Sequence, residues 1–261
     1  PDTRLLWDDR GQTIGYEELL MATGVRPRRL QAEGSDARAV RYFRDLEDYL
    51  DLESRFDRFQ HATCVGGGFL SVELAAALRA RGKEITIVFP DEYPLHRFLP
   101  REIGMGVVDL LRSNGIETVS GETLVAIHED QGWVRGRTYR GDELTTQIVL
   151  VDIGSEAASD LAEAAGLDTD DGIVVDEHGQ ASKPHVWAAG DVAEFPYLAL
   201  GQLMRVEGVD HAEHHGRVVG ANMAGGSTAY AHLPLKYFRI FDVRFEGVGE
   251  INARLQTEVV W

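Results

Sequence analysis

Three consecutive glycines at residues 66–68 most constrain how this chain folds, because they stand between a predicted strand and a predicted helix. The apolar residues 63–65 enter the turn as a short strand. Leucines then recur at helical spacing, at positions 70, 74 and 78, and Gly82 predicts the end of the helix. The β-branched run at residues 85–89 is typical of a buried parallel strand. This order predicts one unit of a parallel α/β sheet.

A glycine turn in this position favours the binding of a dinucleotide. Gly66 permits the tight turn, and Gly68 lets a diphosphate approach the backbone. The helix N-terminus after the turn offers N–H groups and the positive end of the helix dipole. Ser71 replaces the third glycine of the G-x-G-x-x-G pattern, and its small side chain still allows close packing. A glycine-rich turn without any ligand is the alternative.

The sequence offers more than one candidate for the residue that would bind the nucleotide ribose. An acid about 20 residues beyond the motif binds the 2′-hydroxyl of NAD in such units. Phe89 ends the second strand, and Asp91 and Glu92 are the first acids after it. No arginine stands at that strand end, which favours NAD over NADP, although Arg97 is near in sequence.

Composition excludes several classes of function. The 261 residues, 44% of them hydrophobic, predict one large or two ordinary domains. No apolar run approaches the length of a membrane span, so a cytoplasmic protein without a membrane segment is expected. The net charge of −17 disfavours nucleic acid as a partner. Because Cys64 is the single cysteine, the chain can form neither an internal disulfide nor a C-x-x-C redox pair.

Periodicity and turn signals predict further elements on both sides of the glycine turn. Helices are expected at residues 39–59, 101–113, 159–165 and 207–223. Strands are expected at residues 3–7, 13–16, 116–119, 123–127, 133–139, 148–152, 173–176 and 186–191, and within 237–251. The prediction is an α/β fold with a Rossmann-like three-layer nucleotide-binding domain.

Three blocks of sequence stand in a fixed order along the chain. They are Ala22-Thr23-Gly24, the segment from Gly66 to Glu73, and Ala188-Ala189-Gly190-Asp191. Together they resemble the FAD- and NAD(P)-dependent pyridine nucleotide oxidoreductases, which are flavoprotein reductases with two dinucleotide-binding folds. Arg205-Val206-Glu207 and the segment from Phe245 to Glu250 resemble the apoptosis-inducing-factor-like branch of these proteins.

The resemblance implies a FAD-dependent NADH oxidoreductase and a role for each matched residue. Phe69 would stack near the nicotinamide and Glu73 would face the flavin–nicotinamide contact, so these two are the predicted catalytic residues. The predicted NAD-binding residues are Gly66, Gly67, Gly68, Phe69, Leu70, Glu73, Phe89, Asp91, Glu92 and Gly154. The predicted FAD-binding residues are Ala22, Thr23, Gly24, Gly190, Asp191, Glu207 and Gly208. The alternatives are a packing role for Phe69, a solvated charge at Glu73 and an ordinary turn at Gly190-Asp191.

The chain also departs from the family pattern. Members carry a first FAD-binding strand–glycine–helix unit before the Ala-Thr-Gly block, and the 21 residues before Ala22 are too few for such a unit of about 30 residues. A lysine partner for Glu73 is missing, and Gly208-Val209 replaces the ring-bearing residues usual beside the flavin. We therefore expect a chain truncated at both ends and inactive alone.

The same comparison predicts four segments. Residues 1–38 are the first part of a FAD-binding domain, 39–154 the NAD-binding domain, 155–226 the second part of the FAD-binding domain, and 227–261 the start of an α+β C-terminal interface domain.

Because the chain has no cysteine pair, we predict that the flavin passes its electrons to an acceptor outside the protein. NADH would be the donor, and the acceptor would be external: a quinone, an iron–sulfur protein or oxygen. A homodimer is an expected assembly. The alternatives are a nicotinamide-nucleotide-binding module without activity and a ferredoxin- or rubredoxin-reductase-type enzyme. His211 and His215 have a spacing that can bind metal, but no second ligand cluster accompanies them and no metal is predicted.

Overall fold

The structure, a computed structural model, describes residues 3–198 and 200–260. These residues form two compact units. The central unit comprises Pro27–Gly154 with the chain from Tyr237 onward. The flanking unit comprises the N-terminal segment up to Arg26 with Ser155–Lys236. The predicted division into four segments stays a prediction, because the units are defined by packing and not by cofactors.

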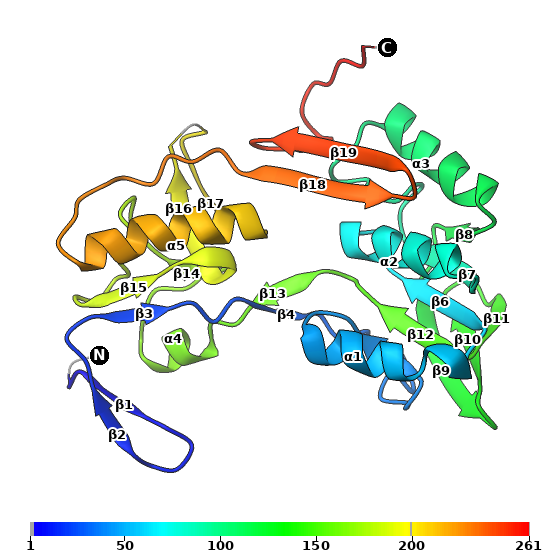
Figure 1. Cartoon of the computed structure of the whole chain (residues 1–261), viewed down its shortest axis with the longest axis horizontal. Coiled ribbons are helices and arrows are strands. Elements are labelled where there is room, and N and C mark those ends of the chain that lie inside the picture. Colours follow the sequence, from blue (N-terminus) through cyan, green and yellow to red (C-terminus); the bar gives the residue numbers. More distant parts are fainter. Residues whose placement is uncertain (1–2, 199, 261) are drawn as a thin grey trace. The chain divides into compact units, whose positions relative to one another are not determined.

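A five-stranded parallel sheet forms the middle of the central unit (Figure 1). Its strand order is β5-β12-β6-β7-β8. The strands are β5 (Val40–Tyr42), β12 (Ile148–Val151), β6 (His61–Val65), β7 (Glu84–Phe89) and β8 (Glu117–Ser120). The glycine turn joins β6 to α2 (Phe69–Ala80), and α3 (Arg101–Ser113) connects β7 to β8. The predicted strand–turn–helix–strand unit is thus confirmed.

Alternating side chains of this sheet pack into two separate cores, because successive residues of a strand point to opposite faces. Cys64 packs in a cluster with Val72 of α2 and Leu111 of α3. Its neighbour Val65 packs in another cluster with Val134. That second face is covered by an antiparallel sheet of β9 (Leu124–Asp130), β10 (Trp133–Thr138) and β11 (Glu143–Thr146). The three-layer α/β prediction is confirmed.

The predicted helical region at residues 39–59 is only partly helical. Val40 and Tyr42 pair with Val149 and Val151, so this segment becomes edge strand β5. A capping box between Asp45 and Asp48 then starts α1 (Leu46–Ser54), and the short 3-10 helix η1 (Phe56–Arg58) follows. The sequence prediction was wrong at residues 40–42, because pairing with a distant strand overrides the amphipathic pattern.

The flanking unit contains short strands around two helices. Its elements are β1 (Leu5–Trp7), β2 (Thr13–Gly15), β3 (Leu19–Met21), β14 (Ile173–Val174), β15 (Val186–Ala188), η2 (Gly190–Val192), β16 (Ala193–Tyr197), β17 (Gln202–Arg205), α4 (Asp160–Ala164) and α5 (Val209–Met223). The strand β3 runs parallel to β15, and β14-β16-β17 form a second sheet. Their core includes Phe195 and Tyr230.

The remaining strands are paired in twos. β4 (Val25–Pro27) pairs with β13 (Ser155–Ala157), and β18 (Leu235–Ile240) pairs with β19 (Val243–Val248). Among the described residues no helix combines the length and the apolar character that a membrane crossing requires.

Candidate functional site

The glycine turn lies at the carboxyl edge of the parallel sheet and is shaped by its protein neighbours. Gly66 has φ +123°, and a Cβ there would lie 1.8 Å from the carbonyl oxygen of Asp152. A Cβ on Gly67 would lie 3.0 Å from the Cβ of Phe89. Gly66 is therefore required by the close approach of the Asp152 backbone, whether or not a ligand is bound, and Gly67 is tightly packed against the Phe89 side chain.

The N-terminus of α2 is partly occupied by a side chain of the protein. Gly68 is the N-cap residue and supplies no capping oxygen. Instead, the carboxylate of Asp152 accepts a hydrogen bond from the backbone N–H of Ser71 at 2.9 Å. Asp152 follows β12, which pairs in parallel with β6. The predicted free N–H group is therefore not available at Ser71. The small Ser71 side chain is buried, which agrees with the close packing expected there.

The two predicted catalytic side chains both contact other residues of the central unit. The Phe69 ring centroid lies 4.5 Å from that of Phe98 and 4.7 Å from that of Phe238. The Glu73 carboxylate accepts a hydrogen bond from the backbone N–H of Arg239 at 2.9 Å. Their roles at a nicotinamide stay a prediction, and this packing matches the alternative role considered for Phe69.

The residues predicted to bind the ribose differ in accessibility. Phe89 has an exposed fraction of 0%, backbone included, and its carbonyl accepts a hydrogen bond from the N–H of Glu122 at 3.0 Å, so Phe89 is a core residue here and the predicted ligand contact stays a prediction. Asp91 and Glu92 are both accessible. Glu92 accepts a hydrogen bond from Nε of Arg101 at 3.0 Å, and this pairing lowers the pKa of Glu92. Asp91 lies 3.7 Å from Nδ1 of His96. Asp91, with the weaker partner, is the better placed of the two to bind a hydroxyl group.

A hollow of about 240 Å³ in the flanking unit brings together four predicted FAD-binding residues. They are Ala22, Gly24, Gly190 and Asp191, and the other lining residues are Leu20, Ala189, Ala212 and Gly216. Small side chains leave room for a narrow ligand segment beside the backbone. Thr23 is not among the lining residues, and its hydroxyl donates to the carbonyl of Ala158 at 2.7 Å.

Charged groups meet around the predicted flavin-contacting Glu207. Arg205 Nη1 donates to the Glu207 carboxylate at 2.7 Å and to the carbonyl of Asp191 at 3.1 Å. The Ser155 hydroxyl also donates to Glu207. Burial lowers the pKa of Lys236, while the charges of Glu207 and Asp191 act in the opposite direction. Sequence reasoning missed Ser155 and Lys236, for which spacing along the chain gives no signal.

The start of α5 differs from the prediction. The helix begins at Val209, so Glu207 precedes it rather than opening it. Gly208 is the N-cap residue with φ +137°, and its N–H donates to the Asp191 carboxylate at 3.2 Å. This positive φ value, which a non-glycine residue rarely adopts, stops the helix from extending back to Glu207.

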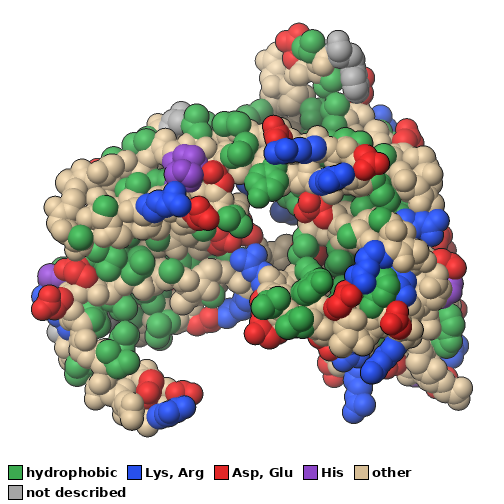
Figure 2. All heavy atoms as spheres, viewed as in Figure 1, with side chains coloured by type: hydrophobic (Ala, Val, Ile, Leu, Met, Phe, Trp, Pro, Cys, Tyr) green, Lys and Arg blue, Asp and Glu red, His purple; other side chains and the backbone are tan. Residues whose placement is uncertain are grey.

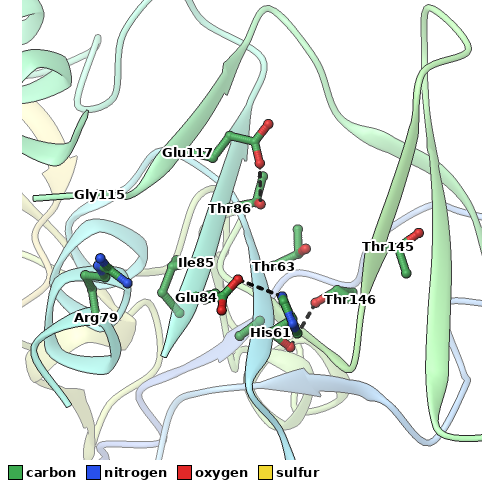
Figure 3. Close-up of a pocket in the computed structure, with 11 residues that line it drawn as sticks. His61, Thr63, Arg79, Glu84, Ile85, Thr86, Gly115, Glu117, Thr145 and Thr146 are labelled. Carbon is green, nitrogen blue, oxygen red and sulfur yellow. Dashed lines mark hydrogen bonds and ion pairs between the residues drawn. The ribbon is translucent and has the colours of Figure 1, made fainter. Parts of the chain in front are cut away.

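A second hollow, of about 480 Å³, lies at the amino ends of β6, β7 and β8 (Figure 3). In it, Thr86 donates to Glu117 at 3.0 Å, and Nδ1 of His61 lies 3.3 Å from Glu84. Ligands of open α/β sheets bind at the carboxyl ends of the strands. This hollow is at the opposite edge and is therefore not the predicted dinucleotide site.

Comparison with known proteins identifies the family of this chain. Residues 2–216 match the family model described as pyridine nucleotide-disulphide oxidoreductase. The chain belongs to this family. The pyridine nucleotide-disulphide oxidoreductases are FAD- and NAD(H)-dependent reductases, so the predicted oxidoreductase class and its cofactors are confirmed at the level of the family.

Individual relatives of the family are similar over nearly the whole chain. The ferredoxin–NAD(+) reductase component of the anthranilate 1,2-dioxygenase system from Burkholderia cepacia is 33% identical, over 97% of this chain and 62% of the relative. Monodehydroascorbate reductase 3 from Arabidopsis thaliana is 32% identical, over 95% and 59%. A ferredoxin reductase structure from Rhodopseudomonas palustris has a TM-score of 0.90 at 31% identity, over 94% and 61%. The chain thus spans about three fifths of these relatives' length.

The residues present fit the family's two cofactors to different degrees. The extended backbone of Gly68 leaves the α2 N-terminus without a capping side chain of its own, which suits a diphosphate. The neighbouring Asp152 carboxylate is negatively charged and therefore repels a diphosphate at this N-terminus. The hollow beside Gly24 and Gly190 offers small residues for part of FAD.

Proposed function

We propose that the whole protein is a FAD-dependent NADH oxidoreductase that delivers electrons to an external acceptor. When bound, FAD supplies the redox chemistry, accepting a hydride from NADH and passing electrons on. The observation that carries the proposal is the glycine turn at the carboxyl edge of a parallel sheet, in a chain of this family.

The proposed task of this chain's residues is to bind and orient the cofactors. Residues 66–70 and Gly154 would hold the dinucleotide of NADH, with Asp91 on its ribose. Phe69 and Glu73 would border the nicotinamide, for which they must exchange some of their present contacts. Ala22–Gly24, Gly190-Asp191, Glu207 and Gly208 would hold part of FAD. Orientation of this kind lowers the entropic part of the barrier to hydride transfer.

Within the part of the protein that this chain spans, the state of its only cysteine supports an external acceptor. Cys64 is buried in the core, and burial raises the pKa of its thiol to about 12. A thiol of this kind forms little thiolate and does not act as a redox partner. The similarity to a ferredoxin–NAD(+) reductase component supports a small iron–sulfur protein as the acceptor. A quinone and oxygen are the other acceptors to compare.

Anaerobic reduction of the full-length protein tests this proposal. We expect NADH to bleach the flavin absorbance, and an iron–sulfur protein to restore it faster than a quinone or oxygen does. NADPH should act more slowly, because the strand end offers acids and no arginine. A flavin that NADH does not bleach would overturn the proposal.

The second candidate is a nicotinamide-nucleotide-binding module without catalysis. It is favoured by the internal contacts of Phe69 and Glu73. Separate titrations of this chain with NADH and FAD distinguish the two candidates. NADH binding without flavin binding favours the module, whereas a flavin-loaded preparation refutes the prediction that the FAD-binding part is incomplete.

Three finer assignments belong to the same proposal. They are membership of the apoptosis-inducing-factor-like branch, a cytoplasmic location and a homodimer. The residue pattern from Arg205 to Glu207 supports the first of these. Light scattering of the full-length protein measures the assembly directly.

A further inference from the structure

A cluster of three potential metal ligands lies in the flanking unit, and none of the three has a role in the function proposed above. Asp210 and His214 are one turn apart on α5, and His232 lies in the loop between α5 and β18. Each offers one ligand atom, and these atoms lie within 4.8 Å of one another. Figure 2 shows histidine side chains gathered on the surface over α5. This cluster is called the Asp-His-His cluster below.

The hydrogen bonds of His214 prepare one of its ring nitrogens for ligation. Its Nδ1 lies 2.8 Å from the backbone carbonyl of Asp210 and 3.5 Å from the Asp210 carboxylate, so ligation by the other nitrogen, Nε2, requires the ring to turn. A carbonyl oxygen only accepts hydrogen bonds, so Nδ1 carries the proton and Nε2 keeps its lone pair. Metal-binding histidines commonly donate their other ring N–H to a backbone carbonyl or a carboxylate in this way.

His232 and Asp210 share a hydrogen bond, and a metal cation could take the place of its proton. Nε2 of His232 donates to the Asp210 carboxylate at 2.6 Å. The backbone N–H of Leu235 donates to the same carboxylate at 2.9 Å and fixes its orientation. The rings of His214 and His232 are stacked, with their centroids 3.8 Å apart and their planes 10° apart. The protein thus holds all three groups close together, and rotation of the two stacked rings would let their nitrogens converge on one ion.

The dimensions suit a small divalent ion after a modest movement. Four N and O ligands around Zn²⁺ lie about 3.4 Å apart when each is about 2.1 Å from the metal. The cluster therefore has to contract by rotation of partly exposed side chains, whose exposed fractions are 42% for His214 and 29% for His232. Two imidazoles and one carboxylate select Zn²⁺, Co²⁺ or Ni²⁺ over Mg²⁺ and Ca²⁺.

We propose that Asp210, His214 and His232 form a binding site for one divalent transition-metal ion, with water completing the coordination. The site is separate from the hollow beside Gly190. Ala212 and Gly216 line that hollow, and each lies two residues, about 200° around the helix, from a ligand of the cluster. Bound metal would tie the loop before β18 to the first turns of α5. The proposal is independent of the proposed redox function.

The neighbouring histidines of α5 do not offer such a site. His211 and His215, the pair whose spacing stands out in the sequence, have exposed fractions of 1% and 0%. His211 contacts the Tyr230 hydroxyl at 2.8 Å, and His215 accepts a hydrogen bond from the backbone N–H of Gly190 at 3.3 Å. They are packing residues in the core around Phe195.

Zinc titration of the tag-free chain tests the proposal after treatment with a chelator. Competition against a chromophoric chelator should show one Zn²⁺ per chain, and Co²⁺ should give a visible absorption band. His214→Ala and His232→Ala should each weaken zinc binding by at least about tenfold. His128→Ala, which removes an exposed histidine of β9, should bind zinc like the wild type.

Thermal unfolding gives a second readout that also checks folding. Zn²⁺ should raise the unfolding temperature of the wild-type and His128→Ala chains and leave that of His214→Ala unchanged. Asp210→Asn keeps an oxygen acceptor for Leu235 while it removes the ligand charge, so it separates metal binding from loop anchoring. The proposal is overturned if the wild type binds no zinc, or if the folded cluster variants bind it as the wild type does.

Discussion

The carboxylate of Asp152 accepts a hydrogen bond at 2.9 Å from the backbone N–H of Ser71, in the first turn of α2. This contact stabilises the helix N-terminus, because it satisfies one of the N–H groups that have no partner within the helix. It also places a negative charge beside the turn that is proposed to hold a diphosphate. Asp152 therefore stabilises the helix N-terminus, and its negative charge repels the diphosphate proposed to bind there.

Replacing Asp152 separates these two effects. Asp152→Asn keeps an oxygen acceptor for Ser71 and removes the charge, so NADH should bind about fivefold more tightly with little loss of stability. Asp152→Ala also loses the hydrogen bond, and its unfolding free energy should fall by about 1 kcal/mol. Calorimetric titration and urea unfolding measure the two quantities. Asp130→Asn, an exposed change, is the control, and equal NADH affinity in all chains would show that Asp152 does not compete.

Gly66→Ala should be severely destabilising. The new Cβ would lie 1.8 Å from the carbonyl oxygen of Asp152, at a φ of +123° that alanine rarely adopts. We expect a loss of at least about 3 kcal/mol in unfolding free energy. Gly132→Ala also has a positive φ, +80°, but no atom lies within 4 Å of its Cβ, so it should lose only about 1 kcal/mol. Similar losses for both would contradict the close-approach argument.

Cys64 should be inert in the folded chain. Burial raises the pKa of its thiol to about 12, and thiol reagents react with the thiolate. A chromogenic disulfide reagent at pH 8 should label the denatured chain fully and the native chain slowly, at the rate of global opening. Rapid labelling of the native chain would place Cys64 at an accessible site and weaken the case for an external acceptor.

Acid should destabilise the flanking unit through its buried histidines. Burial lowers the pKa of His215 to about 3 and that of His211 to about 4. The unfolded residues titrate near pH 6.5, so between that pH and pH 4 the unfolded chain binds more protons and stability falls as pH falls.

Each histidine should contribute a slope of about 1.4 kcal/mol per pH unit within that window. In His215→Gln the stability should depend less steeply on pH, whereas His128→Gln should keep the wild-type slope. Denaturant unfolding between pH 4 and pH 8 measures this. An unchanged slope in His215→Gln would mean that this residue is not buried in its neutral form.

The sequence predicted the central unit better than the contacts around the site. The strand, turn and helix at residues 61–80 follow from local signals: an apolar run, the glycines and the leucine spacing. Val40–Tyr42 was predicted as helix, because only its pairing with β12 makes it a strand. Strands β16 and β17 were missed for a similar reason, since their antiparallel partners are supplied by the fold.

At the candidate site, too, contacts between residues far apart in the sequence could not be predicted from local signals. Ala22, Gly24, Gly190 and Asp191 were predicted from separate motifs, and the structure brings them to one hollow. The contact between Asp152 and Ser71 spans 81 residues of sequence, so no spacing rule predicts it. It could have been anticipated from topology alone, because Asp152 directly follows a parallel strand whose carboxyl end meets that of β6.

Residue-resolved NMR of this chain during titration with NADH tests the central claim most directly. If the glycine turn cradles the diphosphate, the amide signals of Gly67, Gly68 and Phe69 should shift first and saturate together, and the shifts should be larger in Asp152→Asn. If NADH instead shifts only residues around the hollow lined by His61 and Thr86, or shifts none, the assignment of this turn as a nicotinamide-nucleotide site is wrong.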